Sequence, residues 1–224
     1  MLHPPSSVTT CVRGPPVTVA AQAGPHATAS PGAAGTLLRL MARDVIYAMG
    51  VSLDGYVAGP DGGIDWAAPD EELHRFHNAR VRGTDTHLLG RRLYETMRYW
   101  ERAEQNPGAD EVELEFARIW NRIERLVFST TVERAEGGVR LVRGDPVEEV
   151  ARLREQPGGS IGVGGAGLAA TLIAHDLVDE YHLFVHPVVL GGGTPYFPRS
   201  VRRDLRLAET RTFGGGVVFL RYVR

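Results

Sequence analysis

Ser160–His175 reads SIGVGGAGLAATLIAH and joins a short apolar run to a helical pattern through a cluster of glycines. Glycine lets the backbone turn sharply and lets a ligand approach without a Cβ in the way. The first turn of a helix then offers unpaired N–H groups and the positive end of the helix dipole, which suit a phosphate. Leu168, Leu172 and Ile173 give the helix an apolar face. The stretch predicts a strand, a phosphate-binding turn and a helix.

The same letters match the dinucleotide fingerprint G-x-G-x-x-G at Gly162, Gly164 and Gly167. A Rossmann fingerprint normally lies on the first strand of its domain, with several βα units still to come. Only 57 residues follow Gly167 (224 minus 167), and they read mostly as strands. A Rossmann domain and a tight connection that binds nothing therefore remain as alternatives to the phosphate-binding turn.

Composition limits the possible functions. The net charge of −2 over 224 residues gives no argument for binding nucleic acid or an anionic membrane. All 25 basic residues are arginine, which excludes a lysine Schiff base and a P-loop lysine. The single cysteine, Cys11, excludes an intramolecular disulfide and a cysteine metal cluster, which fits a cytoplasmic protein. No apolar run approaches the ~20 residues that span a membrane.

The first 40 residues differ from the rest of the chain. They are rich in Pro, Gly, Ala, Ser and Thr and contain no acidic residue. Such a segment buries too little apolar surface to offset its ordering entropy, so it is predicted to be disordered. A strand follows almost directly after Met41, and this also suggests that residues 1–40 are a spurious extension upstream of the true start. We expect one folded domain over residues 41–224.

Within that domain, strands and helices alternate at first, and strands alone follow. The expected strands are residues 45–51, 56–58, 86–89, 125–128, 139–142, 180–190, 205–213 and 217–223. Besides the helix of the central stretch, the expected helices are residues 69–82, 111–123, 147–155 and one that begins near residue 93. This order predicts an α/β fold with a mostly parallel central sheet and antiparallel C-terminal strands.

Three strand ends carry groups that suit a dinucleotide. They are Gly90-Arg91-Arg92, Ser129-Thr130 and Gly164–Gly167. Ligands of open α/β sheets lie outside the carboxyl ends of the strands, so these turns are expected to converge on one crevice. The planar guanidinium of arginine suits phosphate, and hydroxyl groups suit a ribose phosphate.

With these motifs in place, the chain resembles the dihydrofolate reductase-like family. The segments that carry the resemblance are VSLDGYVAG, LLGRRLYE, LVFSTT, IGVGGAGLAATLI and LVDEYHLFVHPVVLGGGTPYF. The most similar branch is the C-terminal reductase domain of the bifunctional riboflavin-biosynthesis deaminase-reductase, together with its stand-alone relatives. The resemblance covers about residues 44–224. It implies a three-layer fold with helices on both faces of the sheet, and a homodimer formed through the C-terminal strands.

The resemblance also implies an activity and a site. NADPH would deliver a hydride to a C=N or C=O carbon of a heterocyclic or ribosylamino substrate, as in a 5-amino-6-(5-phosphoribosylamino)uracil reductase. The residues implied to bind the cofactor are Gly90, Arg91, Arg92, Ser129, Thr130, Gly164, Gly165, Ala166, Gly167 and Leu168. A dihydrofolate or pteridine reductase and a nucleotide-binding module without turnover are the alternatives.

Two positions depart from the family pattern. Val163 stands where riboflavin reductases commonly carry a substrate-side glutamate, which puts their intermediate in doubt as the substrate. Leu93 stands where dihydrofolate reductases carry a threonine that donates to phosphate.

Asp54 is the candidate catalytic residue, because SLDG interrupts an apolar strand at its carboxyl end and hydride transfer to an imine needs a nearby proton donor or orienting carboxylate. The alternative is that Asp54 only forms a turn before Gly55. Ser52 and Trp66 are candidates for the substrate pocket, although an aromatic residue beside a turn is more often core. His74 and His77 are expected on a solvated helix face, so no metal site is predicted.

Overall fold

The computed structural model describes residues 42–135 and 137–224, so the predicted disorder of residues 1–40 lies outside the described residues. Within the described residues, ten strands are present: β1 (Val45–Ser52), β2 (Tyr56–Ala58), β3 (Thr84–Gly90), β4 (Glu124–Phe128), β5 (Val139–Val142), β6 (Ser160–Gly164), β7 (Glu180–His186), β8 (Thr194–Pro195), β9 (Arg206–Thr212) and β10 (Val218–Val223). The α-helices are α2 (Glu71–Val81), α3 (Arg91–Glu101), α4 (Glu111–Trp120), α5 (Pro146–Arg154) and α6 (Ala166–Ala174), and two short 3₁₀ helices are η1 (Asp65–Ala67) and η2 (Ala103–Gln105).

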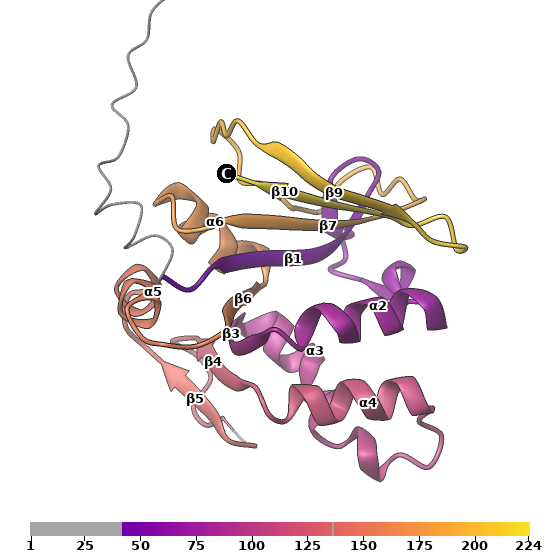
Figure 1. Ribbon diagram of the computed structural model, residues 1–224, viewed down its shortest axis with the longest axis horizontal. Helices are drawn as coiled ribbons and strands as arrows, with labels where there is room; N and C mark the ends of the chain where they lie inside the picture. Colours follow the sequence, from indigo (N-terminus) through magenta and orange to yellow (C-terminus); the bar gives the residue numbers. More distant parts are fainter. Residues whose placement is uncertain (1–41, 136) are drawn as a thin grey trace, which may run out of the picture.

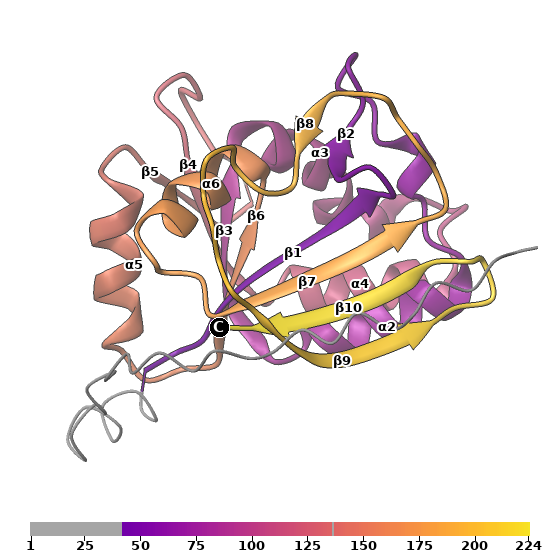
Figure 2. The ribbon, with the colours of Figure 1, turned by 90° about the horizontal axis from the view of Figure 1, so that it is seen from above.

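Eight of these strands form one sheet in the order β5-β4-β3-β6-β1-β7-β10-β9, and β2 and β8 form a separate pair (Figures 1 and 2). The six strands from β5 to β7 pair in parallel. Strand β10 pairs antiparallel with both β7 and β9. The predicted α/β fold, with its mostly parallel sheet and antiparallel C-terminal strands, is confirmed.

Helices cover both faces of the sheet (Figure 1). On one face, α5 and α6 pack on the central strands through a core that includes Val150, Leu172 and Tyr47, all 0% exposed. On the other face, α3 and α4 pack over β3 and β4, and α2 packs over β7 and β10. Parallel pairing brings the carboxyl ends of β1, β3 and β6 to the same edge of the sheet.

The structure corrects two expectations from the sequence. The strand predicted over residues 180–190 ends at His186, because Pro187 has no N–H to continue the ladder and Val188 bonds back to the carbonyl of His186. His74 and His77 do not lie on a solvated face. His74 is only 9% exposed and contacts Trp100 and Phe116, and the ring of His77 lies 4.1 Å from that of Phe184.

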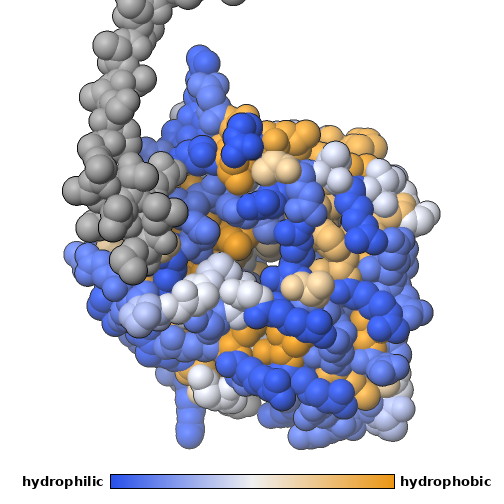
Figure 3. Space-filling model, in the orientation of Figure 1, coloured by the Kyte–Doolittle hydropathy of each residue, from blue (hydrophilic) through white to orange (hydrophobic). Residues whose placement is uncertain are grey.

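The face seen in Figure 1 is mainly hydrophilic, with apolar residues showing in smaller areas between polar ones (Figure 3). Among residues 42–135 and 137–224, none of the helices is both long enough and apolar enough to cross a bilayer. Within the same ranges, no three His, Cys, Asp or Glu side chains are grouped so that they could hold a metal ion.

Candidate functional site

Two strand-to-helix connections meet at the carboxyl edge of the sheet. Strand β3 leads through Gly90 into α3, and the neighbouring β6 leads through Gly165 into α6. Gly165 has φ of 99°, and a Cβ built on it would lie 3.5 Å from the backbone nitrogen of Gly90. The positive φ and this close approach explain why the position takes glycine.

Both helices begin without a capping side chain, since Gly90 and Gly165 are their N-cap residues. Helices α2, α4 and α5 instead begin at Asp70, Asp110 and Asp145, whose carboxylates accept a first-turn N–H. An uncapped helix keeps first-turn N–H groups and a partial positive charge for an external anion. The two uncapped helix starts therefore place open first-turn N–H groups side by side at this edge of the sheet.

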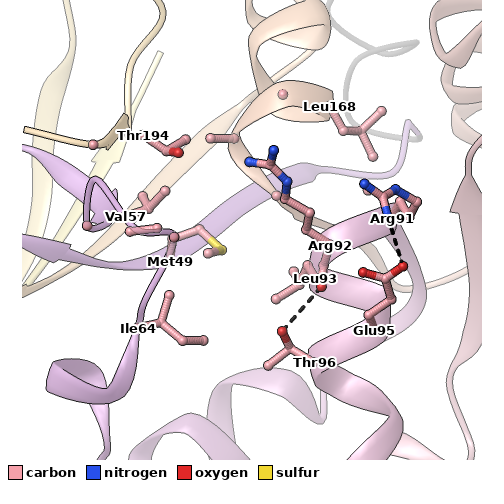
Figure 4. A pocket seen from close by; sticks show the side chains of 18 of the residues that line it. Met49, Val57, Ile64, Arg91, Arg92, Leu93, Glu95, Thr96, Leu168 and Thr194 are labelled. Atoms are coloured by element: carbon pink, nitrogen blue, oxygen red, sulfur yellow. Dashed lines mark hydrogen bonds and ion pairs between the residues drawn. The ribbon is translucent and has the colours of Figure 1, made fainter.

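A cleft of about 1140 Å³ opens over this edge (Figure 4). The residues that line it are Met49, Val57–Gly62, Ile64, Gly90–Leu93 with Glu95 and Thr96, Gly165–Leu168, and Gly193 with Thr194. The predicted residues Gly90, Arg91, Arg92, Gly165, Ala166, Gly167 and Leu168 thus come together around one cavity. Its volume matches the clefts that hold cofactor-sized ligands.

Arg91 and Arg92 lie at the first turn of α3, where a cation is unfavourable beside the positive end of the helix dipole. Arg91 forms an i,i+4 ion pair with Glu95, with 3.0 Å between Nη1 and Oε1. The guanidinium of Arg92 makes no ion pair or hydrogen bond within the described part of the chain and points into the cleft (Figure 4). Such a placement suits an anionic ligand better than it suits the free protein.

The structure separates the glycines of the apparent dinucleotide fingerprint into two roles. A Cβ on Gly162 would lie 2.7 Å from Cδ2 of His87, and one on Gly164 would lie 2.2 Å from Cδ2 of Leu93. These two glycines make room for side chains of β3 and α3, and neither lines the cleft. Gly165 and Gly167 do line it. The G-x-G spacing therefore reflects sheet packing, and the glycines that face the cleft are Gly165 and Gly167.

His87 sits beneath this glycine strand. Its Nδ1 is buried without a hydrogen-bond partner, and its ring lies 5.2 Å from that of Trp120. Burial lowers the pKa of His87 to about 4, so the imidazole is neutral at pH 7. The floor under the two helix starts carries no charge from this residue.

The opposite end of the cleft is apolar, and the residues that line it were not among the predicted site residues. Met49, Val57 and Ile64 lie at this end, away from Arg91 (Figure 4). Strand β2 pairs with β8 here, and a Cβ on Gly193 would lie 2.0 Å from the carbonyl oxygen of Ala58. The turn clusters PDGGID and GGGTP were the available signal, but only the β2–β8 pairing brings them together.

Asp54 does not line the cleft; its carboxylate ties two loops together. It accepts hydrogen bonds from Ser52 Oγ at 2.6 Å, from the backbone nitrogen of Leu190 at 3.1 Å and from that of Gly191 at 2.7 Å. The Ser52 hydroxyl and then these backbone groups hold the pKa of Asp54 below its usual value. These bonds differ from the turn before Gly55 that was the alternative, and a catalytic role stays a prediction.

Ser52 and Trp66 also lie outside the cleft lining. Ser52 is 2% exposed, and its Oγ accepts from the backbone nitrogen of Tyr56 at 2.9 Å. Trp66 is half-buried, donates to the carbonyl of Gly63 and meets His186 edge-on at 5.4 Å. Their assignment to a substrate pocket remains a prediction.

The third predicted turn, Ser129-Thr130, lies beyond the cleft lining as well. Ser129 Oγ accepts from the backbone nitrogens of Thr131 and Val132, and the guanidinium of Arg143 donates to the carbonyls of Ser129 and Thr130. The loop is held by its own bonds, and a phosphate contact from it stays a prediction.

Comparison with known proteins identifies the family. Residues 43–219 match the model of the RibD C-terminal domain. The uncharacterized protein YyaP of Bacillus subtilis (strain 168) is 34% identical over 187 residues, which are 82% of this chain and 96% of YyaP.

Solved structures show the same fold. A protein named for riboflavin biosynthesis from Shewanella sp. PV-4 superposes with a TM-score of 0.63 at 21% identity, over 81% of this chain and 98% of that one. The diaminohydroxyphosphoribosylaminopyrimidine deaminase/5-amino-6-(5-phosphoribosylamino)uracil reductase of Thermotoga maritima gives a TM-score of 0.58 at 18% identity, over 84% of this chain and 58% of that one. The chain belongs to the RibD C-terminal domain family, and its fold is that of the RibD-type reductases.

Proposed function

We propose that this protein is an NADPH-dependent reductase that transfers a hydride to a C=N or C=O carbon of a small heterocyclic substrate. One observation carries the proposal: the uncapped starts of α3 and α6, at Gly90 and Gly165, meet beside two arginines over one cleft. Membership of the RibD C-terminal domain family supports a reductase, and the Thermotoga neighbour is named as one.

The residues present fit a dinucleotide. Open first-turn N–H groups at Gly165–Gly167 and at the start of α3 suit a diphosphate, which could approach closely because Gly165 has no Cβ. Arg92 adds an unpaired guanidinium, and Arg91 can exchange its bond to Glu95 for a phosphate. Bound NADPH would supply the hydride, and the protein would orient it and exclude water from the reaction.

Asp54 enters this proposal as an orienting carboxylate. Its lowered pKa keeps it ionised at neutral pH, so it cannot serve as the proton donor. It holds the loop after β1 against Leu190 and Gly191, next to the apolar end of the cleft. Asp54→Asn is expected to lower the rate of hydride transfer and to leave NADPH affinity unchanged; equal turnover rejects the assignment.

Calorimetric titration of the full chain with NADPH and with NADH tests the cofactor. We expect NADPH to bind at least about tenfold more tightly, because a 2′-phosphate adds about −1.5 to −2 charge near the arginines. Arg92→Gln should weaken NADPH binding about tenfold and change NADH binding less. The matched control is Arg202→Gln, since Arg202 is exposed and pairs only with Asp204 among the described residues. Binding of neither dinucleotide refutes the proposal.

The proposal includes a homodimer formed through the C-terminal strands. Large apolar side chains are exposed at Leu207 in β9, at Val189 after β7, at Phe197 after β8 and at Leu53 after β1. Leu207→Glu is expected to lower the mass measured by light scattering from that of a dimer toward that of a monomer, and a monomeric wild-type protein contradicts the dimer. A cytoplasmic location is also proposed, from the cysteine content alone.

A further inference from the structure

The charges around the cleft are few, and two of them neutralise each other in an ion pair. Four ionisable side chains line it: Asp61, Arg91, Arg92 and Glu95. Asp61 accepts a hydrogen bond from the backbone nitrogen of Gly63 at 2.9 Å within its own turn, and Glu95 pairs with Arg91. Arg92 is the one cation lining the cleft that has no partner within the described residues.

The cofactor proposed above would use this positive charge completely. A 2′-phosphate carries about −1.5 to −2 charge at pH 7, and the diphosphate adds more. Against these stand two guanidinium groups and the partial charges of two helix starts. No cation lining the cleft is left over for a phosphate on the second substrate.

The end of the cleft away from the arginines has no cation among the described lining residues, and its one charged lining side chain is Asp61 of the PDGGID turn. Met49, Val57 and Ile64 line it, and hydroxyl groups come only from Thr96 and Thr194 among the described lining residues. Val163, in the strand before the glycine turn, is 0% exposed in the core and adds no polar group. Moving a phosphate into such surroundings without a partner is costly, whereas a neutral ring gains by leaving water.

Two histidines outside the cleft lining, His186 and the neighbouring His77, are uncharged. His186 lies next to Gly50 of β1, one residue from Met49, and is covered by Trp66. Burial lowers the pKa of His186, and burial together with the neighbouring imidazoles lowers that of His77 to about 4. Both rings are therefore neutral at pH 7.

From this distribution of charge we infer that the hydride acceptor is an uncharged, unphosphorylated molecule with a conjugated C=O or C=N bond, bound at the apolar end formed by Met49, Val57 and Ile64. The inference rests on the proposed function and narrows it away from phosphoribosyl substrates. In the reaction, a hydride with its electron pair adds to the carbon, the π electrons move to oxygen or nitrogen, and that atom takes a proton from water. NADPH is oxidised to NADP⁺ in the same step.

A matched pair of acceptors tests this inference on the full chain: 5-amino-6-ribosylaminouracil and its 5′-phosphate, with a neutral conjugated ketone as a third compound. NADPH oxidation gives kcat/KM, and calorimetry on the protein saturated with NADP⁺ gives the affinity of each compound. We expect the nucleoside to have a kcat/KM and an affinity about tenfold higher than those of its phosphate, and we expect the ketone to be reduced. Equal or better values for the phosphate, or no oxidation with any uncharged acceptor, overturn the inference.

A variant at Ile64 tests whether the acceptor binds at the apolar end of the cleft. Ile64 is 40% exposed, so Ile64→Arg can place a cation at the apolar end without burying it. This variant should shift the ratio of kcat/KM toward the phosphorylated compound, whereas Ile64→Met should keep the ratio. An unchanged ratio in Ile64→Arg overturns the placement. Failure of NADPH to bind refutes the reductase itself, while tight NADPH binding with a preference for the phosphate refutes only this inference.

Discussion

Among the described residues, three helices follow parallel strands within a few residues, yet they begin in two different ways. Helix α5 starts with Asp145 accepting from the nitrogen of Val147 at 2.8 Å, then Pro146, Glu148 and Glu149. Helices α3 and α6 start at Gly90 and Gly165, with no acidic residue in the first turn. The capped start satisfies its N–H groups and its dipole internally. The uncapped starts forgo that stabilisation, and the two of them face the cleft.

The comparison predicts that an added N-cap side chain on α3 lowers the affinity for NADPH without lowering the stability of the fold. Gly90 has φ of −73° and ψ of 155°, which aspartate adopts readily, and a Cβ there meets nothing closer than 3.9 Å. Gly90→Asp should lower NADPH affinity about a hundredfold, because like charges placed together cost several kcal/mol. Stability in urea should be unchanged or slightly higher.

Gly90→Asn is the control for charge, since asparagine caps a helix without repelling phosphate. If Gly90→Asp binds NADPH as tightly as the wild type, the uncapped start of α3 has no role in binding the cofactor.

The second prediction compares the glycines that precede α6 and α5. Gly165 has φ of 99°, whereas Gly144 has no positive φ and nothing within 4 Å of its Cβ position. Gly165→Ala should lower the free energy of unfolding by about 1–3 kcal/mol, because it forces a side chain into strained backbone. Gly144→Ala should change it by less than about 1 kcal/mol in either direction. Equal midpoints in urea would show that the turn before α6 relaxes freely.

The local elements of the fold could be predicted from the sequence because their signals are local. The Asp-Pro start of α5 and the apolar spacing of α6 lie within a few residues of each other. The roles of Gly162 and Gly164 could not be predicted, since His87 and Leu93 reach them only through the pairing of β3 with β6. Ser129 shows the same limit: its hydroxyl suited a phosphate in the sequence, but its bonds depend on how the loop closes.

The third prediction uses two buried imidazoles, one beneath the uncapped helices and one on the capped helix α2. Burial is the main cause that lowers the pKa of His87, beneath the uncapped helices, and of His77, on the capped helix α2, in both cases to about 4. The unfolded chain therefore binds more protons than the folded one between about pH 6.5 and 4, and stability falls as the pH falls through this window.

Replacing either residue should remove about one proton from this dependence. His87→Leu and His77→Phe each test one region, and the free energy of unfolding measured from pH 7 to pH 4 reports the change. A slope that neither variant alters would show that both imidazoles bind protons in the folded protein as they do in the unfolded chain.

The smallest expected effect tests whether the cap of α5 is purely structural. Asp145→Ala removes the carboxylate that accepts from Val147 and should lower the free energy of unfolding by about 1 kcal/mol. NADPH affinity should not change, because Asp145 and α5 do not line the cleft. Urea unfolding and calorimetric titration of the same preparation give both quantities. A loss of NADPH affinity in Asp145→Ala would mean that all three connections cooperate in binding, and the division between capped and uncapped helices would then not separate stability from function.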